Sequence, residues 1–155
     1  MRILLSEKYP EIKPTGESVG GRDTYILLKN VIVIIISDSN NCTYTINIPK
    51  GFVFDGASVP FGLWNIFPPL DSDYLIAALL HDFLYQSEYF DRKICDEVFY
   101  TALLTMKITH CKAYLMYLAV RLGGWQTWST HNRSQVMRVR NLAGIYMDER
   151  PLILL

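Results

Sequence analysis

The chain has 155 residues, half of them in the hydrophobic class, which fits one domain with a hydrophobic core. Fifteen basic and fifteen acidic side chains cancel, so no overall positive charge attracts the protein to nucleic acid. Three cysteines are too few for a disulfide framework and favour a reducing compartment.

We expect no signal peptide in the first residues, because the apolar start is interrupted by Ser6, Glu7 and Lys8. The apolar run at residues 31–36 is too short to cross a bilayer as a helix. We therefore expect a soluble cytoplasmic protein without a transmembrane segment, with secretion by an unconventional route left open.

The first third of the chain predicts β-structure, while residues 1 to about 22 suggest only an extended or loop-rich segment. Asp38 to Asn41 supply side chains that tolerate a tight turn between two β-branched runs. The pattern predicts an antiparallel hairpin with a third strand and a short strand end. These strands are expected at residues 24–28, 31–37, 42–48 and 52–54.

The remainder predicts helices, because apolar residues recur at helical spacing and polar caps precede them. The third helix should stop at Gly123-Gly124, since glycine often ends helices. We expect helices from residue 72 or 73 to 85, 91 to about 107, 109 to 121, and a short one near 134–140. We thus predict one α+β domain, 1–155: a β region to about 54 packed on a three-helix core, about 55–124, and a tail, 125–155.

The most informative feature is His81-Asp82, followed fifteen residues after the histidine by Asp96 in the next predicted helix. Each helical residue advances about 1.5 Å, so an antiparallel hairpin places His81 and Asp96 at about the same height. The carboxylate would orient the imidazole while its other nitrogen takes a proton from water. This pattern predicts a catalytic base and its supporting carboxylate.

Three further residues extend this site. Tyr85, one turn after His81, shares its helix face and can donate its phenolic proton to Asp96. Asp82 points about a third of a turn away and suits a cation beside the base. Asp55, followed by Gly56, whose backbone allows close approach, is the best second ligand for a hard ion such as calcium. The combination indicates ester hydrolysis.

Residues 52–124 resemble prokaryotic phospholipase A2, a family in which the histidine of a His-Asp pair is the general base. The resemblance lies in His81-Asp82-Phe83-Leu84-Tyr85, in Arg92 to Asp96, and in Ala113 to Gly123. It implies that Asp82 binds calcium, that Asp96 supports His81, and that Asp55 belongs to a calcium loop. The secreted members use disulfides, which this chain lacks the cysteines to reproduce.

A second resemblance covers residues 45–124 and is closer. Gly51-Phe52, the run Asp55 to Pro60, Trp64 and the His-Asp-x-x-Tyr helix are similar to a family of uncharacterised phage and bacterial proteins. That family implies no activity, so two functions remain open. One is a calcium-dependent lipid or ester hydrolase, active at a membrane interface if residues 61–67 form an exposed apolar rim. The other is a non-catalytic accessory protein that binds a protein partner.

Two other chemistries are disfavoured. A His-Asp metal phosphohydrolase needs a further histidine upstream, and this chain has none before His81. Cys95, beside Asp96, is read as a small core residue rather than a thiol nucleophile. The remaining histidines, His110 and His131, are expected at a helix start and in the tail.

Overall fold

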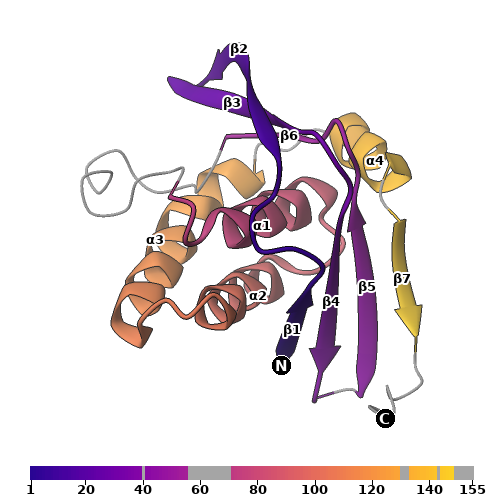
Figure 1. Cartoon of the computed structure of the whole chain (residues 1–155), viewed down its shortest axis with the longest axis vertical. Coiled ribbons are helices and arrows are strands. Elements are labelled where there is room, and N and C mark those ends of the chain that lie inside the picture. The colour runs from indigo at the N-terminus through magenta and orange to yellow at the C-terminus, as the bar shows by residue number, and fades with distance from the viewer. Residues whose placement is uncertain (40, 56–70, 130–132, 143, 149–155) are drawn as a thin grey trace.

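The computed structural model describes residues 1–39, 41–55, 71–129, 133–142 and 144–148, and Figure 1 shows their arrangement. Within these ranges the chain forms an α+β fold, which confirms the predicted class. The strands are β1 (Arg2–Leu5), β2 (Ile12–Val19), β3 (Arg22–Leu27), β4 (Val31–Ser37), β5 (Cys42–Ile48), β6 (Val53–Phe54) and β7 (Gly144–Asp148). The helices are α1 (Leu75–Ser87), α2 (Arg92–Thr105), α3 (His110–Ser129) and α4 (Arg133–Leu142).

The strands form two antiparallel sheets, one in the order β1-β4-β5-β7 and the other in the order β2-β3-β6. In β4, Val31, Val33 and Ile35 are buried and alternate with more exposed residues, as expected for a strand with one face on the core. The helices lie on that side of the larger sheet, and the β2–β3 hairpin extends beyond it (Figure 1).

Helix α1 is the centre of the fold, because every residue from Leu75 to Tyr85 is buried. It contacts α2, α4 and the short strand β6. Its C-terminus is bound by a residue of another helix: Arg140 of α4 donates through Nε to the main-chain oxygen of Ser87 at 2.6 Å. A cation there also suits the negative end of the helix dipole. The helix that carries the His-Asp pair is thus fixed along its length.

The structure corrects the expected end of α3 and the expected C-terminal tail. Residues 1 to about 22 take the extended of the two expected forms, as strands: β1 pairs with β4, and β2 pairs with β3. The short helix expected near 134–140 is present as α4, but α3 does not end at residue 121 and continues through the glycine pair to Ser129. The described residues of the expected tail, 125–129, 133–142 and 144–148, form the end of α3, helix α4 and β7, which completes the larger sheet beside β5.

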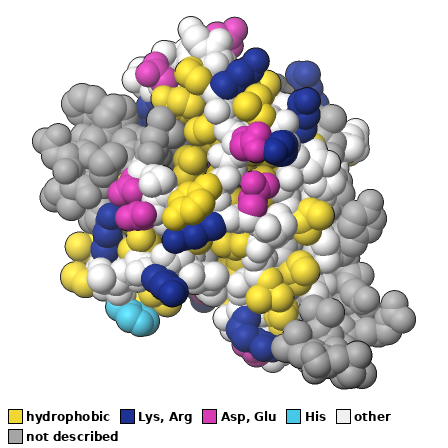
Figure 2. All heavy atoms as spheres, viewed as in Figure 1, with side chains coloured by type: hydrophobic (Ala, Val, Ile, Leu, Met, Phe, Trp, Pro, Cys, Tyr) yellow, Lys and Arg dark blue, Asp and Glu magenta, His cyan; other side chains and the backbone are white. Residues whose placement is uncertain are grey.

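The surface of the described part carries charges of both signs. Figure 2 shows acidic and basic side chains interspersed across one face, with hydrophobic side chains between them. Among the described helices, none is both long and apolar enough to cross a membrane.

Candidate active site around His81

Two adjacent polar residues lie in the most buried helix of the protein. His81 is 2% exposed and Asp82 is 6% exposed, although the rest of α1 is almost entirely apolar. Burying an ionisable group is costly unless a partner or a change of protonation compensates for it. The structure should therefore show a specific partner for each side chain.

The partner of His81 is Asp96. The Nε2 atom of His81 lies 2.9 Å from Oδ1 of Asp96, which is completely buried in the first half of α2. Helices α1 and α2 pack against each other, so the fifteen-residue separation brings the two side chains together as the helical spacing predicts. This contact is confirmed.

Asp96 is held by more than His81. The Tyr85 hydroxyl donates to the same oxygen, Oδ1, at 2.6 Å, which confirms the contact predicted from the helix face. The other oxygen, Oδ2, accepts a hydrogen bond from Nη1 of Arg121 on α3 at 2.7 Å. Arg92 lies 3.9 Å from Oδ2 and donates to the main-chain oxygen of Arg121. Both carboxylate oxygens are therefore engaged.

These contacts set the protonation of the pair. Burial raises the pKa of Asp96, but hydrogen bonds from His81, Tyr85 and Arg121 outweigh burial and bring that pKa below its usual value. Burial lowers the pKa of His81 despite the opposing effect of Asp96. Near pH 7 Asp96 is thus ionised and His81 neutral. The ionised carboxylate can only accept, so Nε2 carries the proton and Nδ1 carries the basic lone pair.

Gly124 provides the space for Tyr85. A Cβ atom built on Gly124 would lie 2.6 Å from the Tyr85 hydroxyl, far inside van der Waals contact. The ring of Tyr85 also packs edge-on against Trp128, which lies in α3 with Gly124, and the ring centroids are 5.1 Å apart. This close approach explains why a glycine lies inside α3: Gly124 is required for packing against Tyr85. The sequence alone suggested that the glycine pair ends the helix.

We expect Gly124→Ala to destabilise the protein by about 1–3 kcal/mol, because the added methyl group must displace a tyrosine fixed by Asp96. Gly123→Ala is the matched control, since a Cβ there meets no atom within 4 Å and alanine favours the helix by about 1 kcal/mol. Urea denaturation of both variants measures the difference. Equal stability of the two variants would contradict the packing role of Gly124.

The second polar residue of the helix, Asp82, faces Asp55 rather than the dyad. Burial, then the nearby Asp55 carboxylate, raise the pKa of Asp82 well above its usual range, although Arg22 and the main chain of Asp55 oppose this. Its Oδ2 atom has no hydrogen-bond partner within the described part of the chain. Asp55 itself is paired with Arg22 of β3, at 3.1 Å. The structure thus brings together the two carboxylates predicted to bind a cation.

The carboxylate pair fits a hard cation in the nature of its donors. A buried carboxylate oxygen without a partner is a group whose burial a cation would compensate. Two carboxylates are nevertheless fewer than calcium needs, and among the described residues no cluster of three or more His, Cys, Asp or Glu side chains could hold a metal. Gly56 and the apolar residues 61–67, also predicted to contribute, lie outside the described residues.

The raised pKa of Asp82 predicts a pH-dependent cost to stability. Below about pH 4 the carboxyl is protonated in both folded and unfolded chains, so it costs nothing. As the pH rises further, the unfolded chain ionises while the folded protein retains the proton, so stability falls until the folded pKa is reached. We expect Asp82→Asn to gain stability over the native protein progressively between about pH 4 and 7.

Urea denaturation across this pH range, in buffer without divalent cations, measures the effect. The exposed Asp73→Asn is the control, for which we expect no comparable trend. A stability difference for Asp82→Asn that does not change with pH would contradict the assignment.

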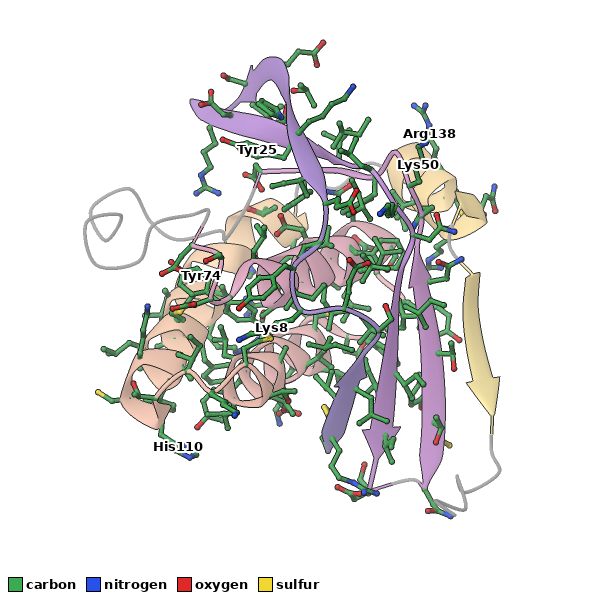
Figure 3. The ribbon with its side chains drawn as sticks, in the orientation of Figure 1. Lys8, Tyr25, Lys50, Tyr74, His110 and Arg138 are labelled. Atoms are coloured by element: carbon green, nitrogen blue, oxygen red, sulfur yellow. The ribbon has the colours of Figure 1, made fainter. Side chains whose placement is uncertain are left out.

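Sequence reasoning missed two residues that support Asp96 and its tyrosine. Arg121 and Gly124 lie three residues apart and so share a face of α3, a spacing that could have indicated a common target. Arg22 gave no local signal, because it reaches Asp55 from a strand 33 residues away. The structure agrees with the readings of Cys95 and His110, whereas His131 lies outside the described residues. Burial raises the pKa of Cys95 to about 12, so its thiol is protonated, and His110 points outward at the start of α3 (Figure 3).

Together, fold and site define an α+β protein whose central buried helix carries a His–Asp pair supported from two neighbouring helices. The chain belongs to the family described as Protein of unknown function (DUF1353), whose model matches residues 33–120. The match includes His81, Asp82, Tyr85, Asp96 and Asp55. No curated protein and no solved structure gave a match.

Proposed function

We propose that the protein is an ester hydrolase of the phospholipase A2 type that acts on lipids and depends on calcium. The observation that carries this proposal is the orientation of His81. Its Nε2–H is tied to a fully buried, ionised Asp96, which leaves Nδ1 as the basic nitrogen of a neutral imidazole. A positioned neutral histidine is the most common general base in hydrolysis.

In this reaction Nδ1 of His81 removes a proton from water as the water oxygen attacks the ester carbonyl. The imidazolium that forms is stabilised by Asp96 and returns the proton to the alkoxide, which leaves as an alcohol with the acid as co-product. Tyr85 and Arg121 keep Asp96 in place during this exchange. They act as positioning residues.

The carboxylate pair supports the cation part of the proposal. Asp82 and Asp55 are the residues that would hold calcium, whose charge would stabilise the oxyanion of the intermediate. Oδ2 of Asp82, which has no hydrogen-bond partner among the described residues, is the structural feature that favours a ligand here.

An exposed apolar face on α3 supports a lipid substrate. Leu122 is 82% exposed and Trp125 is 66% exposed, on the same helix that supplies Arg121 and Gly124. Within His110–Ser129 the sequence has no acidic residue to repel an anionic lipid surface. Apolar and aromatic side chains in such a setting favour the boundary of a lipid bilayer. None of the three cysteines forms a disulfide, which supports a reducing, cytoplasmic location.

The direct experiment measures fatty-acid release from phosphatidylcholine vesicles by the purified protein, with calcium or with EDTA. We expect release in calcium, little release in EDTA, and weaker hydrolysis of a water-soluble short-chain ester. Absence of fatty-acid release at every calcium concentration, from a protein shown to be folded, would rule out the proposed activity on phospholipids.

A second candidate is a non-catalytic accessory protein that uses the helices as a scaffold for a protein partner. The observation that favours it is the 2% exposure of His81, because a base must reach its substrate. On this alternative the buried network only holds α1, α2 and α3 together. Stability would then depend on Asp96, while no ester would be hydrolysed.

A further inference from the structure

Asp55 makes two contacts that a bound cation would have to share. Its Oδ2 atom accepts a hydrogen bond from Nη1 of Arg22 at 3.1 Å, and its carboxylate also lies against Asp82. Both members of the Arg22–Asp55 pair are 29% exposed, so the contact is partly shielded from solvent. A guanidinium therefore already occupies one side of the carboxylate pair.

The sheet places Arg22 there. Strand β6 ends at Phe54, which pairs with Tyr25 of β3. Because the two strands are antiparallel, Asp55 continues toward the end of β3 that begins with Arg22. Figure 3 shows Tyr25 on this strand, in the hairpin that extends from the body of the protein. The Arg22–Asp55 contact thus links the β2–β3 hairpin to the residue that faces the central helix.

The charges on the two sides of Asp55 differ. On one side Arg22 supplies a full positive charge, and on the other Asp82 has an oxygen with no partner within the described ranges. A divalent ion that binds both carboxylates would come close to the guanidinium. Like charges in close proximity repel each other, and more strongly when they are partly shielded from water.

We propose that Arg22 is an internal competitor for the cation, so that the Arg22–Asp55 ion pair and a divalent ion bridging Asp55 and Asp82 are alternative states. The inference rests on the cation site of the proposed function and adds its regulation. Release of Arg22 is the step that makes Asp55 available. The β2–β3 hairpin therefore tunes cation affinity through one side chain.

The test compares calcium binding by the native protein with binding by Arg22→Gln, using calorimetric titration and the shift in melting temperature. We expect Arg22→Gln to bind calcium at least about tenfold more tightly, because a nearby positive charge has been removed. Arg22→Lys, which keeps the charge, should remain near the native affinity. Arg2→Gln is the matched control, since Arg2 lies 4.0 Å from Asp38 at the surface and should leave the affinity unchanged.

Each result has a definite reading. Unchanged or weaker calcium binding by Arg22→Gln, with binding by the native protein that Asp82→Asn removes, would overturn the competitor role but leave the cation site intact. Calcium binding by Arg22→Gln but not by the native protein would support a cation site that Arg22 closes. Absence of binding by native protein and by Arg22→Gln would overturn both the inference and the calcium dependence. Fatty-acid release, measured separately, reports on the hydrolase itself.

Discussion

Asp96→Asn is expected to lower the free energy of unfolding by about 3–5 kcal/mol, the range for breaking a buried charge pair by removal of one partner. The carboxylate is fully buried and satisfies His81, Tyr85 and Arg121 at once. An asparagine amide supplies one acceptor oxygen and turns two N–H donors toward groups that also donate. Arg121 then loses its charge partner.

Urea denaturation followed by circular dichroism measures this effect. The neighbouring Glu97→Gln is the matched control, since the Glu97 side chain is 44% exposed and its carboxylate lies 3.8 Å from the exposed Lys93. Exposed pairs of this kind contribute about 0–1 kcal/mol. A loss for Asp96→Asn no larger than the loss for Glu97→Gln would show that the network does not stabilise the fold.

His81→Gln is expected to reduce ester hydrolysis by at least about 10²-fold, because general-base catalysis typically contributes 10²–10⁴-fold. Glutamine can still donate a hydrogen bond to Asp96, so the support of that carboxylate is preserved while the base is removed. The measurement is the initial rate of fatty-acid release, normalised to the folded fraction of each sample.

His110→Gln provides the control for this prediction, because His110 is exposed at the start of α3. Its rate should equal that of the native protein. If His81→Gln keeps more than a tenth of the native rate, His81 is not the base. If the native protein and both variants show no rate above background, the scaffold function becomes the better account.

Elements that depend on local sequence could be predicted, whereas elements that depend on contacts between distant residues could not. Strands β4 and β5 were recognisable because both are rich in β-branched residues over seven positions, which is a local property. Strand β7 has only five residues and is held by pairing with β5, about a hundred residues away. Such pairing depends on tertiary structure, so the C-terminal part of the chain gave little local signal.

The same distinction applies to the site. His81, Tyr85 and Asp96 lie on two consecutive helices, so helical geometry alone brought them together. Arg121 and Arg22 come from α3 and β3, whose positions relative to the dyad depend on the complete fold. Gly124 was misread for a related reason: a glycine that permits close packing resembles a glycine that ends a helix until its neighbour is known.

The central claim is that His81 is held as a neutral base with its proton on Nε2. Nitrogen-15 NMR of the imidazole side chain near pH 7, with His110→Gln and His81→Gln used to assign the signals, tests it most directly. We expect His81 to show a protonated Nε2 and an unprotonated Nδ1, and to stay neutral to lower pH than an exposed histidine. A doubly protonated His81 at pH 7, or a proton on Nδ1 alone, would contradict the proposed base.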